Sequence, residues 1–196
     1  LPASTTAEID RYTRKLIAYE TNPGRGDYSY LSRALFFSSD EMRDYTGGGQ
    51  HTLIAKAYPS HIDVDTTVGV EASFGGDPAP TNVGGASVND SIENGYGIVN
   101  IIAHGRYDGF AVKSASYNAW PKSLFLSDFL GSAHTDVSLL RANGLVSFYY
   151  SLACDVGGFD ENLAPLNHLG TNFVQRMLTL DSAGAVAFVG YSRWGW

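Results

Sequence analysis

Two short apolar stretches constrain the fold of this chain more than any other feature. Residues 97–105 read Gly-Ile-Val-Asn-Ile-Ile-Ala-His-Gly, and residues 147–154 read Ser-Phe-Tyr-Tyr-Ser-Leu-Ala-Cys. Apolar runs of this length, bounded by glycine or polar residues, are typical of strands buried on both faces of a parallel sheet. Ligands bind just beyond the carboxyl ends of such strands. The sequence therefore predicts that His104 and Cys154, each at the end of a run, share one edge of a sheet.

A helix is predicted near the start of the chain. Thr5-Thr6-Ala7-Glu8 fits a capping box, and a helix of about fifteen residues is expected after it. It ends near Thr21-Asn22-Pro23-Gly24, because proline and glycine do not continue a helix. Its inward-facing residues, chosen by helical spacing, are Ile9, Tyr12, Leu16 and Tyr19.

Strands and helices alternate along the rest of the sequence. Between 105 and 140 the pattern is irregular and aromatic, and we expect loops there with one short helix over 123–130. Alternation of this kind predicts an α/β three-layer sandwich with a mainly parallel sheet. The other predicted strands are 33–39, 68–70 and 185–190, the helices are 51–58, 87–93 and 168–180, and the loops are 75–85 and 155–166.

Length, charge and cysteine content limit the possible functions. The 196 residues suit one domain over 1–196, and the ends at Leu1 and Trp196 suggest a segment of a longer chain with further domains. A net charge of −7 without a basic cluster argues against nucleic-acid binding. No apolar run approaches the roughly 20 residues that cross a bilayer, so we expect no membrane insertion. The single cysteine cannot form an internal disulfide.

The pairing of Cys154 with His104 is more informative than either residue alone. A cysteine in an apolar strand is commonly a small buried side chain, and a histidine beside glycine is commonly a hydrogen-bonded turn residue. Two strand ends at one edge instead bring together a thiol nucleophile and a group that transfers its proton. Gly105, which has no Cβ, would let its N–H approach a substrate carbonyl, so that it forms an oxyanion hole with the N–H of Cys154.

These residues resemble a known family. His104-Gly105 after one apolar strand, Ala153-Cys154 after another, and the closing run Gly184-Ala185-Val186-Ala187-Phe188-Val189-Gly190 resemble the gingipain-type cysteine peptidases, relatives of caspases and legumains. The opening Leu1-Pro2-Ala3-Ser4 and the helix after it also look like the start of that family's catalytic subdomain. The resemblance covers most of the chain and implies a caspase-like fold.

The resemblance also implies roles for individual residues. Cys154 is similar to the nucleophile, His104 to the general acid/base, and Gly105 to an oxyanion donor. The strand that ends in Asp40-Glu41 is similar to the one that carries the acid orienting the histidine. Glu41 is the first choice for that acid and Asp40 the second, while a solvated acidic turn is the alternative reading of both.

The chain departs from the family pattern in two places. The 50 positions between 104 and 154 indicate an insertion over 106–143, beside the cleft. Members that cleave after Arg or Lys have an acid in the region matching 46–51, where this chain has Gly47-Gly48-Gly49-Gln50. A preference for basic residues is therefore not carried over, and Asp44 is only a weak substitute.

Other candidate sites give weaker signals. A solvated acidic loop explains Asp155, Asp160 and Glu161 better than a calcium site, since their spacing matches no calcium loop. We expect neither a metal nor another cofactor, because the remaining histidines do not show zinc-ligand spacing: His51, His61, His134 and His168. The residues past the last predicted strand could line a substrate pocket or pack against another domain: Tyr191, Arg193, Trp194 and Trp196.

The leading expectation is a cysteine endopeptidase that hydrolyses peptide bonds through a thioester acyl-enzyme. The alternatives are a sortase-like transpeptidase that uses the same site, and a non-catalytic binding module of a secreted surface protein. The expected partners are protein or peptide substrates. The resemblance further implies export to the surface or surroundings of a bacterium.

Overall fold

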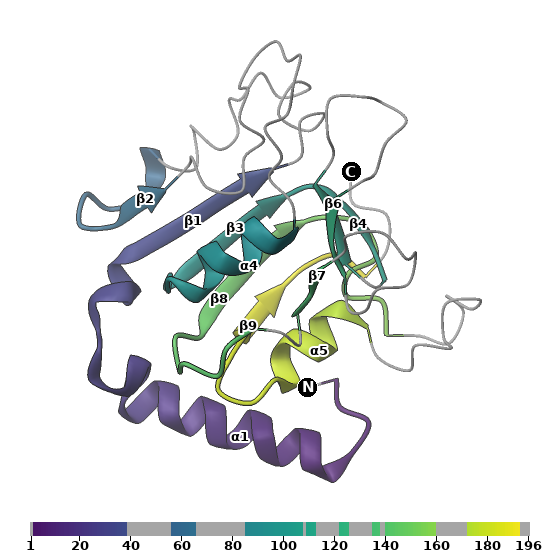
Figure 1. Cartoon of the computed structure of the whole chain (residues 1–196), viewed down its shortest axis with the longest axis horizontal. Helices are drawn as coiled ribbons and strands as arrows, with labels where there is room; N and C mark the ends of the chain where they lie inside the picture. Colours follow the sequence, from purple (N-terminus) through teal and green to yellow (C-terminus); the bar gives the residue numbers. More distant parts are fainter. Residues whose placement is uncertain are drawn as a thin grey trace.

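The fold is described from a computed structural model, for residues 2–38, 56–65, 85–107, 109–112, 122–125, 135–137, 140–159 and 172–192 (Figure 1). Within these ranges, no helix is long and apolar enough to cross a bilayer. The helical elements are α1 (Thr6–Thr21), η1 (Pro23–Gly26), η2 (Ser29–Ser32), α4 (Gly85–Glu93) and α5 (Phe173–Thr179). The strands are β1 (Arg33–Ser38), β2 (Asp63–Asp65), β3 (Ile98–Ile102), β4 (His104–Arg106), β5 (Gly109–Val112), β6 (Lys122–Phe125), β7 (Thr135–Asp136), β8 (Ser147–Leu152) and β9 (Ala185–Val189).

The central sheet has five strands in the order β2-β1-β3-β8-β9, and every neighbouring pair is parallel. Parallel pairing requires long crossover connections, which place the carboxyl ends of all the strands at one edge. The predicted α/β class with a mainly parallel sheet is thus confirmed. The strands predicted at 33–39, 97–105, 147–154 and 185–190 are present as β1, β3, β8 and β9.

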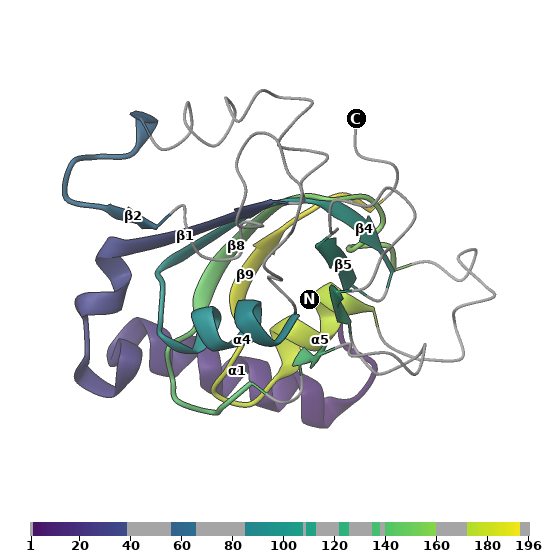
Figure 2. The same cartoon turned by 45° about the horizontal axis from the view of Figure 1, so that its top comes forward.

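Helices α4 and α5 lie on one face of the central sheet, and α1 runs along its β9 side (Figure 2). Ile92 of α4 and Met177 of α5 belong to the same buried cluster as Val99 of β3. On the opposite face, Phe148 and Tyr150 of β8 are 38% and 39% exposed. The prediction that β8 is buried on both faces is therefore wrong, because its residues alternate between the core and the surface. No second helical layer over β8 is found among the described residues.

Helix α1 confirms the predicted capping box, and its buried face matches the predicted one in part. Of the residues predicted to face inward, Tyr12, Leu16 and Tyr19 are half-buried. Thr5 Oγ1 accepts from Glu8 N at 3.2 Å, and Glu8 Oε2 accepts from Thr5 N at 3.1 Å. The inward face follows Glu8, Tyr12 and Lys15, whereas Ile9 is 49% exposed. The polar residues are buried because they have partners on α5 and its flanks. Helix α1 packs against α5 and β9 (Figure 1).

A second, four-stranded sheet lies where loops were predicted. Its order is β4-β5-β6-β7, and it occupies parts of 104–136. The predicted helix over 123–130 is wrong where the structure describes it, because residues 123–125 belong to β6. Short strands of this kind are stabilised by their neighbours rather than by a local apolar period, so the sequence pattern did not reveal them. The sheet packs against α4 through β6 and β7.

Other predicted elements have mixed outcomes. Helix α4 confirms the helix predicted over 87–93, and α5 begins five residues later than the helix predicted over 168–180. Residues 155–159, the described part of the loop predicted over 155–166, contain no helix or strand, as predicted. The predicted strand over 68–70, and most of the predicted helix over 51–58 and of the loop over 75–85, lie outside the described residues.

Lys15 gives the fold a testable pH dependence. Its Nζ donates to Met177 O at 3.1 Å and to Ala183 O at 3.0 Å. Burial lowers the pKa of Lys15 from 10.5 to about 7, and the Asp181 carboxylate opposes this shift. Between these two pKa values the unfolded chain binds more protons, so the free energy of unfolding should rise with pH by up to about 1.4 kcal/mol per unit.

Urea unfolding of the wild type and of Lys15→Met at pH 7, 8 and 9 measures this contribution. The wild type should gain stability relative to the variant as the pH rises, because the variant has no titrating amine at this position. Parallel stability curves for the two proteins would contradict the assignment.

Candidate active site

The ends of β3 and β8 carry the two predicted catalytic residues. Ile102 pairs with Leu152 at the last position of both strands. His104 and Cys154 each follow this pair by two residues, so they leave the sheet at the same edge. The prediction that each residue is the last of its strand is wrong: Cys154 lies in the turn after β8, and His104 begins β4 of the second sheet. The prediction that the two apolar runs lead to one edge agrees with the register.

Gly105 brings the two chain segments into direct backbone contact. A Cβ on Gly105 would lie 2.8 Å from Ala153 Cβ and 2.9 Å from Cys154 N, and still closer to Cys154 O. Side-chain carbons do not approach other atoms this closely, so only glycine allows β4 to pass against the Ala153-Cys154 backbone. This close packing is a reason for the glycine that sequence reasoning missed. It fixes the segment that carries His104 against the segment that carries Cys154.

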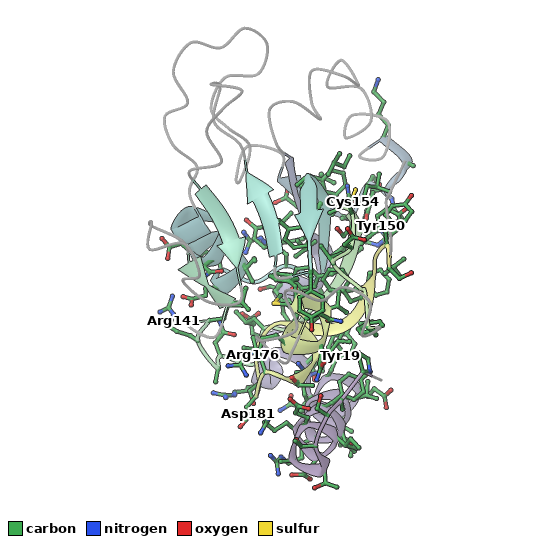
Figure 3. All side chains as sticks on the ribbon, turned by 90° about the vertical axis from the view of Figure 1, so that its right-hand side faces the viewer. Tyr19, Arg141, Tyr150, Cys154, Arg176 and Asp181 are labelled. Carbon is green, nitrogen blue, oxygen red and sulfur yellow. The ribbon has the colours of Figure 1, made fainter. Side chains whose placement is uncertain are left out.

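Cys154 begins a tight turn that closes on itself. The cysteine is half-buried, and Asp155 after it adopts φ of +56°, a left-handed conformation that aspartate tolerates better than most residues. Gly158 N donates to Asp155 O at 3.0 Å. Gly157 N donates to Tyr191 O at 3.0 Å, which ties the turn to the chain just past β9. Figure 3 shows Cys154 far from α1, on the opposite side of the described residues.

The first turn of α5 is hydrogen-bonded to the segment after β4 and to the turn after Cys154. Phe173 N donates to Tyr107 O at 2.9 Å, just past β4, and Val174 N donates to Val156 O at 3.3 Å, in the turn after Cys154. The amino-terminal N–H groups of a helix have no partners within the helix. In α5 these donors are used to fix the β4–β5 connection and the cysteine turn on a single rigid element.

Aromatic side chains support this arrangement from the core. The rings of Phe110 on β5 and Phe173 on α5 meet edge to face, with centroids 4.6 Å apart. Phe188 of β9 lies 6.4 Å from Phe173 and stacks on Tyr149 of β8 at 5.4 Å. These ring contacts pack the second sheet, α5 and the central sheet against one another.

The remaining predicted site residues are only partly described. Tyr191 is 37% exposed, and its carbonyl holds the cysteine turn. No group of three or more potential metal ligands occurs in the part of the chain that the structure describes. The candidate acids Asp40 and Glu41 lie outside the described residues, as do Arg193, Trp194, Asp160 and Glu161.

Asn172 is the residue next to the site that sequence reasoning missed. It precedes α5 directly and is 1% exposed. An asparagine before an apolar helical run is a recognised helix-start signal, but the predicted helix began at His168, which hid it. The side chain contacts both the helix and the cysteine turn.

Comparisons with known proteins agree with this architecture. The model of peptidase family C25 matches residues 1–196. The crystal structure of gingipain R (RgpB), an Arg-specific cysteine proteinase, matches with a TM-score of 0.57 and 14% identity, over 95% of this chain and 37% of that one. The complex of RgpB pro- and mature domains from Porphyromonas gingivalis matches with 0.59 and 13%, over 97% and 39%. A third structure, of a protease, matches with 0.61 and 16%, over 99% and 36%.

These likenesses extend over nearly all of this chain but little more than a third of each relative. At such low identity they establish the shared fold alone. The search of curated proteins found no match. The match of the family model spans every residue of the sequence and confirms the resemblance inferred from the two strand ends. The chain belongs to peptidase family C25, the family of the gingipains.

Proposed function

We propose that this protein is a cysteine endopeptidase with Cys154 as its nucleophile. The observation that carries the proposal is the contact of Gly105 with the Cys154 backbone at the shared edge of β3 and β8. It keeps the segments bearing a thiol and an imidazole together at the edge where parallel sheets bind ligands. Because the chain belongs to a peptidase family, this arrangement supports attack of the thiol on a peptide bond.

In the proposed reaction, the Cys154 thiolate attacks the carbonyl carbon of a peptide bond. The N–H groups of Gly105 and Cys154 stabilise the resulting oxyanion. The carbon–nitrogen bond then breaks as His104 donates a proton to the leaving amine, which leaves a thioester. His104 next accepts a proton from water, whose oxygen attacks the thioester and releases the carboxylate product and the thiolate.

Three further assignments belong to the proposal. Glu41, or Asp40 as the second choice, orients the histidine. The substrates are proteins or peptides, with no preference for basic residues assigned. The family supports a bacterial enzyme that acts in the medium or at the cell surface, and the greater length of the solved relatives supports further domains in the parent protein.

Labelling with a peptidyl acyloxymethyl ketone tests the proposed nucleophile. Because the chain has one cysteine, a thioether adduct should map to Cys154 alone. The adduct should form at least about tenfold more slowly in His104→Ala, since the thiol then lacks its proton-transfer partner. Mass spectrometry of the intact protein and of its peptides measures both effects.

A folded protein that stays unlabelled across a series of peptidyl groups would contradict the proposal and favour the non-catalytic alternative. An amine added during turnover separates the remaining alternatives, because a transpeptidase would transfer the acyl group to it whereas a hydrolase would release mainly the acid.

A further inference from the structure

We propose that Asn172 is a positioning residue, whose side-chain amide holds the turn after Cys154 in the geometry that the reaction needs. The inference rests on the proposed peptidase function. It extends that function by assigning a role to a residue outside the predicted site, the residue that caps the amino terminus of α5.

The amide of Asn172 makes two hydrogen bonds in opposite senses. Its Oδ1 accepts from Gln175 N at 2.7 Å, which caps α5. Its Nδ2 donates to Gly158 O at 2.8 Å, in the turn that begins with Cys154. The orientation of the amide is unambiguous, because a backbone N–H only donates and a carbonyl only accepts.

The chemistry of the side chain argues for more than helix capping. Serine, threonine and aspartate cap helices about as well as asparagine. Among the usual capping side chains, only asparagine has both an oxygen that accepts from a helix N–H and a separate NH₂ group that donates to another carbonyl. The Asn172 side chain is 1% exposed, so water does not readily replace either bond. The donor at Nδ2 is therefore the feature that capping alone leaves unexplained.

Gly158 belongs to the turn after Cys154, so the bond from Asn172 Nδ2 helps to hold that turn in place. Gly158 N already donates to Asp155 O, and the neighbouring Gly157 N donates to Tyr191 O. Of these three contacts of the turn, the bond from Asn172 is the one made by a side chain, and the other two join backbone groups. Without it, the buried Gly158 carbonyl loses its partner, and the turn must shift to find another. A shift of about 1 Å in a catalytic group can lower a rate by about a hundredfold.

Two substitutions separate positioning from capping. Asn172→Ser keeps a capping oxygen for Gln175 N but cannot reach Gly158 O. Asn172→Asp keeps the shape of the side chain, but as a carboxylate it has only acceptors facing that carbonyl. The control is Thr5→Ala, which removes the cap of α1, an element without a described contact to the cysteine turn. It reports what loss of a helix cap alone does to activity.

The expected result is a kcat lowered by about 10- to 100-fold in both Asn172 variants, with KM changed less than about threefold. Thr5→Ala should keep wild-type kcat at a similar loss of thermal stability. In Asn172→Asp, the ratio of variant to wild-type kcat should rise as the pH falls, because a protonated carboxyl again donates to Gly158 O.

Wild-type kcat in Asn172→Ser, or an equal loss of kcat in Thr5→Ala, would overturn the inference. The serine variant decides the matter if the aspartate variant does not fold. An inactive wild type that the ketone probe also fails to label would overturn the proposed function itself, whereas an active wild type with indifferent Asn172 variants would overturn only the positioning role.

Discussion

Replacing Cys154 with alanine is expected to lower peptidase kcat by at least about a thousandfold, because the proposed nucleophile is lost. The fold should tolerate the change. Cys154 is half-buried at the start of a turn, and alanine fits the space of the thiol-bearing side chain. The melting temperature should therefore stay within about 3 °C of wild type for a chain of this size.

Steady-state kinetics on a peptide library, together with thermal unfolding, measures both quantities. Cys154→Ser is the matched variant, since it keeps a side-chain nucleophile of similar size but a much less ionised one. It should also fall at least about a thousandfold below wild type, because a hydroxyl needs a stronger activating base than a thiol does. Substantial turnover in Cys154→Ala would place the nucleophile elsewhere and would overturn the proposed function.

Replacing Gly105 with alanine is expected to lower kcat by at least about a hundredfold, because the new methyl group displaces the segments that carry the proposed catalytic residues. The added Cβ would lie 2.9 Å from Cys154 N, closer than real contacts allow. Most of the atoms it meets belong to the backbone and cannot move aside by a change of side-chain rotamer. Either β4 or the cysteine turn must shift, so His104 and Cys154 separate.

Gly26→Ala is the matched control for Gly105→Ala. Gly26 has φ of +98°, so alanine is strained there, but the nearest atom to its Cβ would be Asn22 Oδ1 at 3.7 Å. This variant should lose some stability and keep its kcat. Unchanged kcat in a folded Gly105→Ala would show that the contact between the two segments does not matter for catalysis.

Local sequence signals predicted β1, β3, β8 and β9 of the central sheet, but not β2. The apolar runs that became β3 and β8 are short, bounded and close to uniform, and the capping box of α1 is formed by residues adjacent in sequence. The glycine at 105 was also singled out, although for access to an oxyanion rather than for close packing. Such features are encoded locally, and neighbouring residues suffice to recognise them.

Features that depend on partners distant in sequence were not predicted. Helix α1 buries Lys15, whose Nζ donates to carbonyls more than 150 positions away. The second sheet forms because short strands between 104 and 136 pair with one another and pack on α4. Periodicity does not report a buried lysine with two acceptors or a strand of two to four residues.

By itself, the sequence determined the α/β class, the strands that end near His104 and Cys154, and the residue types available for chemistry. Only the tertiary structure decided how those strand ends are held together. Gly105 packs on the Cys154 backbone, and Asn172 bonds to Gly158 O across 14 positions of sequence. The physical reason is that apolar patterning selects elements, whereas contacts between backbones and single polar atoms depend on where the folded chain places them.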